Sequence, residues 1–214
     1  MERGWVGRLE GDEVVHLAAQ TLQHLFTGGG TARDHARYAL ADVELLSPLP
    51  SPPSVRVFDA GGSFEFANPA AVVGPDAVAT VPDSAPIVVD ASLAGLVGLD
   101  AVVAVAPVAR LRAPALDPPK DRDFAIALGP WFTTTDEAPE AATLQVTAVG
   151  VDAEGSAGRV DWEAARRFAA ANTRLRVGDL LVAPAAVVAE VPGAGAVSIE
   201  VEALGTLRLT LQTA

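Results

Sequence analysis

The sequence predicts an α+β fold that consists mainly of β-strands, and three observations support this prediction. Half of the residues are hydrophobic but only 5% are aromatic, so valine, leucine and alanine must build most of the interior, and valine favours strands. Between residues 55 and 105, short apolar runs alternate with Gly, Pro and Asp, as in strands separated by turns. One long segment, 161–175, has the apolar spacing of a helix.

The first residues predict a hairpin followed by a short helix. Residues 5–17 read as two short strands around residues 10–12, whose residue types tolerate the backbone angles of a tight turn. Residues 18–26 place apolar side chains at the i, i+3 and i+4 positions of a helix. The three glycines at 28–30 end this helix and predict a flexible joint.

A proline-rich stretch separates this beginning from the rest of the chain. Residues 47–55 contain four prolines, and proline restricts both itself and the residue before it to extended conformations. Domains usually contain ~100–200 residues, so the chain is long enough for one domain with a small appendage. We therefore expect a small N-terminal segment, 1–47, and a main domain, 48–214.

In the main domain we expect strands at the short apolar runs bounded by turn residues, namely 55–60, 70–74, 77–81, 86–98 and 101–109. The helix over 161–175 has Asp161 as its expected N-cap and places Trp162, Ala165, Phe168 and Ala169 on one face. A turn at Gly178-Asp179 leads into another strand. Two alternating runs joined through Gly205 close the chain as paired strands.

Composition excludes several classes of protein. The net charge of −12 argues against a nucleic-acid partner, because binding phosphates requires a basic surface. The chain has no cysteine, which excludes disulfides, thiolate zinc sites and a cysteine nucleophile. Its beginning lacks the apolar run of a signal peptide, and no window approaches the ~18 apolar residues of a membrane span. We expect a cytoplasmic protein without a membrane partner.

Five segments in order resemble the fumarylacetoacetate hydrolase family, and they are residues 48–58, 64–78, 120–137, 174–181 and 201–211. Each segment alone is a weak signal, but together they cover most of the main domain. The resemblance implies a mixed β-sandwich roll, often dimeric, so a homodimer is expected. It also implies enzymes that use a divalent cation to cleave, decarboxylate or isomerise small oxo acids.

The resemblance also implies a metal site that this sequence does not preserve. The family pattern has two glutamates one residue apart on a strand, which share one face, and a later aspartate. Here Asp90 and Ser92 stand at the two glutamate positions and Ala106 at the aspartate position. Asp100 and Asp117 are possible substitutes, or simply surface aspartates. The expected cofactor is therefore none, or a weakly bound Mg²⁺ or Mn²⁺ with Asp90 as its residual ligand.

The resemblance also implies that this chain lacks the catalytic base of the family. The family carries a His-Glu pair on a lid that precedes an Asn-Pro dipeptide, whereas residues 57–69 reach that dipeptide without a histidine or room for a lid helix. Ala185 stands where the family has a threonine hydroxyl close to substrate.

Two basic residues remain at positions that the resemblance assigns to substrate binding. Arg110 and Lys120 could bind the carboxylate of a small carboxylic or oxo acid through charge-assisted hydrogen bonds. The alternative is that Lys120 is a solvated loop charge balanced by Asp121 and Asp123, with an equally ordinary surface role for Arg110.

Three hypotheses about function follow. The first is a fumarylacetoacetate hydrolase-like protein, related to enzymes that cleave carbon–carbon bonds of acylpyruvates and diketo acids, whose own hydrolase activity is weak or lost. The second is a non-catalytic binding or assembly module on the same fold. The third is a metal-free enzyme with a new oxo-acid-like substrate, in which Asp90 is the catalytic base.

Overall fold

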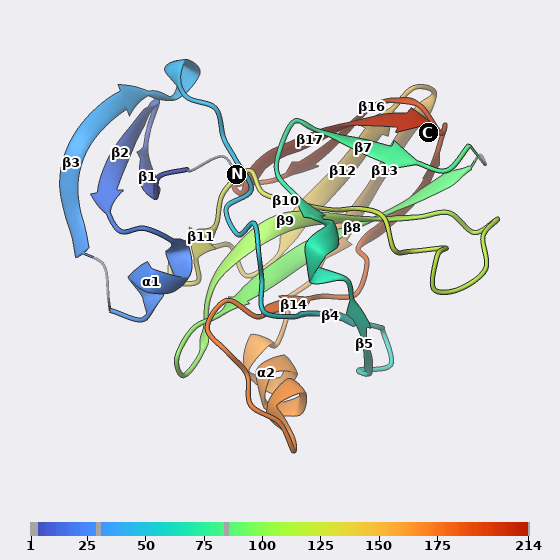
Figure 1. Ribbon diagram of the computed structural model, residues 1–214. Coiled ribbons are helices and arrows are strands. Elements are labelled where there is room, and N and C mark those ends of the chain that lie inside the picture. Colours follow the sequence, from blue (N-terminus) through green and yellow to red (C-terminus); the bar gives the residue numbers. More distant parts are fainter. Residues whose placement is uncertain (1–3, 29–30, 84–85, 214) are drawn as a thin grey trace.

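The computed structural model describes residues 4–28, 31–83 and 86–213 of the chain. Within these residues the chain forms three β-sheets and two α-helices, so the predicted α+β fold made mainly of strands is confirmed. Figure 1 shows a small N-terminal sheet to one side of two larger sheets that together make the body of the molecule.

The N-terminal sheet is antiparallel and has the order β1-β2-β3, formed by β1 (Gly7–Glu10), β2 (Glu13–Ala18) and β3 (Thr31–Ala39). The predicted hairpin is thus confirmed. The expected helix is α1 (Leu22–Phe26), whose first turn is capped by the hydroxyl of Thr21, which accepts a hydrogen bond from the amide of His24. The expected joint at Gly28–Gly30 falls largely on residues 29 and 30, which lie outside the described residues.

Strand β3 was not expected from the sequence. Its residues, TARDHARYA, are mostly polar and lack the apolar alternation that marks a half-buried strand. The strand forms because it pairs with β2, which the sequence pattern alone does not reveal. A short 3-10 helix, η1 (Leu40–Asp42), follows it.

The largest sheet has nine strands, seven of them in the order β5-β4-β14-β8-β9-β10-β6, with β11 paired to β9 and β15 to β8. These are β4 (Val55–Phe58), β5 (Phe64–Ala67), β6 (Val72–Val73), β8 (Ile87–Val97), β9 (Val102–Arg112), β10 (Ile126–Leu128), β11 (Thr133–Thr134), β14 (Leu180–Val182) and β15 (Val187–Val191). A 3-10 helix, η2 (Pro69–Ala71), precedes β6. The sheet is mixed, because β14 runs parallel to β4 and β10 parallel to β6.

The second large sheet has five strands in the order β13-β12-β16-β17-β7, formed by β7 (Ala77–Val81), β12 (Ala142–Ala148), β13 (Val151–Ala157), β16 (Gly195–Val201) and β17 (Gly205–Thr213). The two C-terminal strands pair as predicted, with their turn ending at Gly205. One face of this sheet packs on the nine-stranded sheet, and alternate residues along β12, β16 and β17 are buried there.

Strand β8 is buried along its whole length because it separates two hydrophobic cores. Ala91 and Leu93 face the core between the two large sheets. Ala94 and Leu96 face a second core, to which β4, β14, β9, β10 and β6 all contribute. Since β4 and β6 lie near opposite ends of one sheet, that sheet curls around the second core. Burial on both faces explains the nearly continuous apolar run in this strand.

The long helix is α2 (Trp162–Ala170), and Asp161 caps it by accepting a hydrogen bond from the amide of Ala164 at 2.9 Å. It ends earlier than the predicted residue 175, and Asn172 then adopts a left-handed backbone conformation with φ of 59°. Trp162 and Ala169 pack on the sheet. Phe168, expected on the same face, is instead half exposed.

The N-terminal segment contacts the main body at two places. Phe26 of α1 packs against the second core, and the backbone at Ser47 approaches Gly74 so closely that a Cβ on this glycine would overlap the amide nitrogen of Ser47. The N-terminal segment therefore packs against the main body. The domain boundary between residues 47 and 48 stays a prediction.

We predict that Gly155→Ala destabilises the fold. A Cβ on Gly155 would overlap the carbonyl oxygen of Ala186 in the loop between β14 and β15, and overpacking of this kind costs about 1–3 kcal/mol. Urea unfolding should show this loss. The control, Gly158→Ala, places its Cβ in open space and should leave stability unchanged. Equal stability of both variants would mean that β13 does not contact this loop.

Candidate functional site

The residues expected at the metal site lie on β8, on the face that points into the curled sheet. Asp90 and Ser92 are two residues apart and share this face. Strand β9 runs antiparallel to β8, so Asp90 lies directly opposite Arg110 and Ser92 opposite Val108. The predicted strand and the shared face are therefore present, but the partner of Asp90 across the sheet is a cation.

Two arginines of β9 hold the carboxylate of Asp90. Arg112 donates two hydrogen bonds, from Nε to Oδ2 at 2.5 Å and from Nη2 to Oδ1 at 2.8 Å. Arg110 donates a third, from Nη2 to Oδ2 at 3.2 Å. The Asp90 side chain is only 9% exposed. Both of its oxygens are thus occupied by fixed, charge-assisted hydrogen bonds away from bulk water.

Further charges extend these contacts into a chain of ion pairs. Arg110 also pairs with Glu65 on β5, and the other oxygen of Glu65 accepts from Arg122 at 2.8 Å. Arg122 donates to Asp121 at 2.6 Å. We call these six residues the ion network, which consists of Glu65, Asp90, Arg110, Arg112, Asp121 and Arg122. Its three positive and three negative charges balance.

A tight hairpin brings Glu65 to this position. Strands β4 and β5 are joined by residues 59–63, and Asp59 closes the turn by accepting hydrogen bonds from the amide and the hydroxyl of Ser63 at 3.0 and 2.6 Å. This segment was expected to lack room for a lid helix, and it forms a turn. The hairpin places a carboxylate beside Arg110.

Three members of the network, Arg112, Asp121 and Arg122, have pKa values that their partners shift in favour of the charged form. The pKa of Arg112 is raised because Asp90 accepts its hydrogen bonds, and the pKa of Arg122 is raised chiefly by its hydrogen bonds to Asp121. In return, Arg122 lowers the pKa of Asp121 below the ordinary aspartate value. The charged form of each of these groups is therefore favoured by its partner.

The other two positions of the expected metal site hold no charge. The hydroxyl of Ser92 lies 2.9 Å from the carbonyl oxygen of Ala183 and 2.8 Å from that of Pro184, so it is directed at the backbone. Ala106 is fully buried in the second core, opposite Ala94. Ala185, in the same loop as Ala183 and Pro184, carries no hydroxyl.

These residues do not fit a Mg²⁺ or Mn²⁺ ion. Such ions require several hard oxygen ligands, whereas this position offers one carboxylate that two guanidinium groups already hold. Across the described parts of the chain, no group of three or more His, Asp or Glu side chains is placed to hold a metal. Asp100 and Asp117, considered as substitutes, are exposed in loops.

Lys120 shares no hydrogen-bond or ion-pair partner with Arg110 among the described residues. Its ammonium group is 71% exposed and pairs with Asp123 at 2.7 Å, and Asp123 also accepts a hydrogen bond from Asn68 at 2.8 Å. No hydrogen bond or ion pair among the described residues joins Lys120 to the ion network. The structure thus brings Arg110 to Asp90 and leaves Lys120 on a surface loop.

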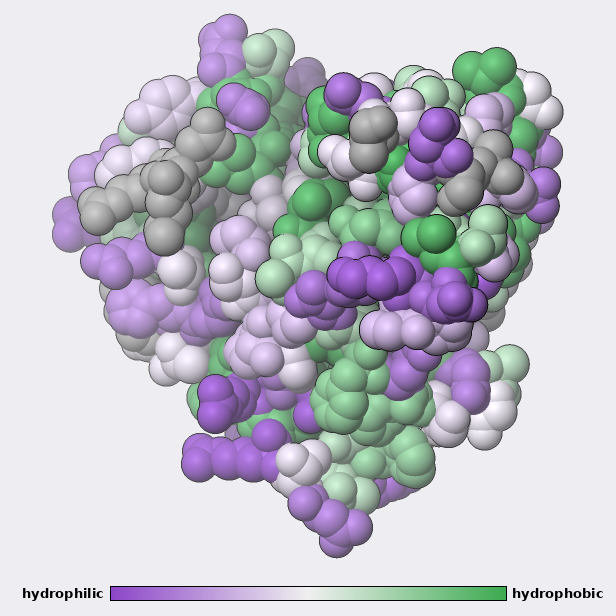
Figure 2. All heavy atoms as spheres, turned by 45° about the vertical axis from the view of Figure 1, so that its right-hand side comes forward, coloured by the Kyte–Doolittle hydropathy of each residue, from purple (hydrophilic) through white to green (hydrophobic). Residues whose placement is uncertain are grey.

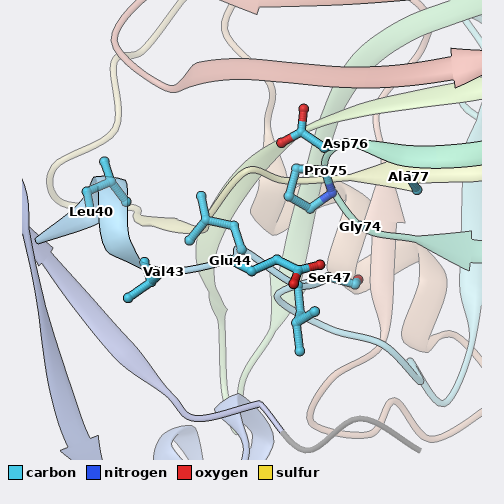
Figure 3. Close-up of a pocket in the computed structure, with 10 residues that line it drawn as sticks. Leu40, Val43, Glu44, Ser47, Gly74, Pro75, Asp76 and Ala77 are labelled. Atoms are coloured by element: carbon cyan, nitrogen blue, oxygen red, sulfur yellow. The ribbon is translucent and has the colours of Figure 1, made fainter. Parts of the chain in front are cut away.

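A hollow of about 590 Å³ lies elsewhere, between the segment after β3 and residues 74–77 (Figure 3). Glu44 and Asp76 are its two acidic residues, and Figure 3 shows their carboxylates pointing in different directions. The remaining lining residues are uncharged, and none belongs to the ion network. The hollow therefore lacks converging polar groups that would define a reaction.

Sequence reasoning missed most members of the network. The sequence alone assigns no role to Glu65, Arg112 or Arg122. It identifies Asp121 only as a charge that balances Lys120. The spacing of Arg110 and Arg112 does place both on the face of β9 that meets Asp90, but this signal is readable only when the register between the strands is known.

The fold is shared with several solved enzymes. Maleylpyruvate hydrolase from Sphingobium sp. SYK-6 matches with a TM-score of 0.81 and 20% identity, over 100% of this chain and 98% of the hydrolase. The 5-carboxymethyl-2-hydroxymuconate delta-isomerase from Mycobacterium smegmatis matches with a TM-score of 0.80 and 19% identity, over 98% and 94%. The 2-hydroxyhepta-2,4-diene-1,7-dioate isomerase from Mycobacterium marinum matches with a TM-score of 0.77 and 21% identity, over 98% and 93%.

The chain therefore has the fold of the fumarylacetoacetate hydrolase family, as its motifs predicted, and the match includes the N-terminal sheet. The TM-scores of 0.77 to 0.81 establish this fold, whereas identities near 20% leave the reaction open. No protein-family model matches the sequence, and no curated protein matches it either. No helix among the described residues has the length and apolar character needed to cross a membrane.

We predict that Asp90→Ala strongly destabilises the protein. Removing one partner of a buried ion pair typically costs about 3–5 kcal/mol, and this change leaves Arg110 and Arg112 without the carboxylate between them. Urea unfolding measures the loss. The control, Lys120→Ala, removes only the exposed partner of an ion pair, because Asp123 keeps its hydrogen bond from Asn68, and it should cost about 1 kcal/mol or less. Similar losses in the two variants would contradict the structural role of Asp90.

Asp121 should make stability depend on acid pH. Because Arg122 lowers its pKa in the folded state, the ionised carboxylate stabilises the fold above the unfolded pKa of about 3.9, and this contribution disappears as pH falls through the lower folded value. Asp121→Asn should therefore flatten the decline of the urea midpoint below about pH 4. Arg122→Gln should flatten it in the same way, and unchanged slopes in both variants would exclude the pair as the cause.

Proposed function

We propose that this chain is a member of the fumarylacetoacetate hydrolase family that has lost the metal-dependent reaction and serves as a binding or assembly module. The observation that carries the proposal is the carboxylate of Asp90, which Arg110 and Arg112 hold with three hydrogen bonds. The charge balance that a cation would supply at this strand comes from arginine side chains.

Arg110 and Arg112 would compete with a cation for the carboxylate of Asp90, and this competition supports the proposal. A cation that used this carboxylate would have to displace two guanidinium groups, leaving them close together and close to the cation. Ser92 and Ala106 offer no carboxylate to offset that cost. One related structure, the Sphingobium maleylpyruvate hydrolase, was solved with manganese and pyruvate. In our proposal the present chain keeps the fold of that enzyme without its metal chemistry.

The same contacts give little support to a metal-free enzyme that uses Asp90 as a base. A general base must bring a lone pair within hydrogen-bond reach of the substrate proton. On Asp90 two arginines already take three of the roughly four lone-pair positions, two on Oδ2 and one on Oδ1. Ser92, two residues along, is directed at backbone carbonyls.

A small carboxylic or oxo acid stays a candidate ligand under one condition. Arg110 pairs with Glu65, so an incoming acid must replace this side chain, which is 41% exposed and belongs to a hairpin at the sheet edge. A homodimer, expected from the family resemblance, stays part of the proposal as well.

Calorimetric titration of Mn²⁺ into the EDTA-treated protein tests the proposed loss of chemistry. We expect no heat of binding in the micromolar range and no Mn²⁺-dependent turnover of acylpyruvates. The Sphingobium hydrolase, which shares the fold, serves as the positive control under the same conditions. A micromolar isotherm, or turnover that requires Mn²⁺, would overturn the proposal, and its absence in Asp90→Ala would then identify the ligand.

A further inference from the structure

The charge of this acidic chain is unevenly distributed. Residues 159–176, which comprise α2 and the segments that enter and leave it, contain five arginines and two carboxylates, a net charge of +3. The whole chain carries −12, so the remainder carries −15. The segment around α2 therefore concentrates positive charge in a chain that is otherwise strongly acidic.

The guanidinium groups of these five arginines form no ion pairs within the described part of the chain. Arg159, Arg166, Arg167, Arg174 and Arg176 form no ion pair with any residue that the structure describes, in contrast to the arginines of the ion network. All except Arg166 are exposed. Their charge is available to a partner.

An aromatic cluster adjoins them. Phe168 of α2 packs edge-on against Phe64 of β5 with ring centroids 5.8 Å apart, and Phe64 packs against Phe66 at 5.5 Å and against Phe58 at 5.4 Å. Phe66 is 69% exposed and Phe168 is 51% exposed. Figure 2 shows hydrophobic residues gathered at the lower end of the molecule, over β5 and α2, with hydrophilic residues beside them.

A buried cation holds this cluster in place from beneath. The guanidinium of Arg56 lies 5.7 Å from the ring centre of Phe64 and 5.2 Å from that of Phe66. Arg56 in turn donates to the hydroxyl of Ser54 at 2.5 Å and pairs with Asp179 at 3.4 Å. Arg56 therefore helps to order the exposed ring of Phe66, and the exposed ring of Phe168 packs on Phe64, which Arg56 also contacts. Such order before a partner arrives reduces the entropy lost on binding.

We propose that Phe66 and Phe168, together with the five arginines of residues 159–176, form a docking surface for an acidic segment of another protein that carries apolar anchor side chains. Aromatic residues and arginine are the types enriched at the energetic centres of protein interfaces. The arginines attract the carboxylates of the partner and the rings receive its apolar side chains. This surface deepens the proposed binding or assembly role by naming the chemistry of the partner.

The distribution of charge also argues against two other partners at this docking surface, a second copy of the chain and a nucleic acid. A two-fold dimer across this surface would set the arginines of one copy against those of the other, and like charges across an interface are strongly unfavourable. A nucleic acid extends beyond a patch of this size, and the remaining charge of −15 would repel its phosphates.

The probe is a short fluorescent peptide in which glutamates flank tryptophan and leucine, and its binding is followed by anisotropy at low and at high salt. We expect binding that weakens as salt rises, and that weakens about tenfold or more in Phe66→Ala and in Arg167→Ala. The matched controls, Val188→Ala and Arg208→Ala, change an exposed hydrophobic residue and an arginine elsewhere and should bind as the wild type does. Unfolding midpoints confirm that each variant is folded.

Three results would overturn the proposal. The first is that the wild type does not bind the peptide, or that the surface and control variants bind it equally. The second is that a single-stranded oligonucleotide binds this surface more tightly than the peptide. The third is a change of oligomeric state in Phe66→Ala, which would show that a second copy covers the rings. None of these results depends on the Mn²⁺ titration, so this surface and the proposed loss of metal chemistry fail separately.

Discussion

The pairing of β8 with β9 is the interaction on which the rest of this structure depends. Each strand has eleven residues, and nearly all of them are buried or half-buried. Strands β14 and β15 pair with β8, and β10 and β11 pair with β9, so the whole large sheet is assembled around these two strands. From Ile87 to Leu96 on β8 and from Ala104 to Leu111 on β9, the apolar core residues with odd numbers face the core of the sandwich and those with even numbers face the core inside the curled sheet.

A carboxylate in the middle of such a strand needs a counter-charge, because a buried ion without a partner is very unstable. In this chain the register sets Arg110 opposite Asp90, and Arg112 completes the contact. Further ion pairs extend from Arg110 through Glu65 and Arg122, which are partly exposed, to Asp121, which is buried. In our proposal, arginine side chains supply the positive charge at Asp90 that a bound cation would otherwise supply, and the fold is kept.

Much of the fold could be predicted from the sequence. Local signals were sufficient for the N-terminal hairpin, the N-cap at Asp161, the long strand over Asp90 and the paired C-terminal strands, because each depends on residues close together in the chain. Strand β3 and the early end of α2 were missed. The strand forms only through pairing with β2, and the helix ends before Asn172, a residue type that favours the left-handed conformation but was not read as a stop signal. The ion network was missed because strand register and the curl of the sheet bring Glu65 and Arg110 together, although they are far apart in sequence.

We propose that arginine side chains, and no metal ion, neutralise Asp90. The most direct test is a crystal structure of the protein grown in MnCl₂, with anomalous scattering recorded at the manganese absorption edge. Our account predicts no anomalous peak within bonding distance of Asp90, and both of its oxygens hydrogen-bonded to Arg112 and Arg110. A manganese peak coordinated by Asp90, with the arginines displaced, would contradict it.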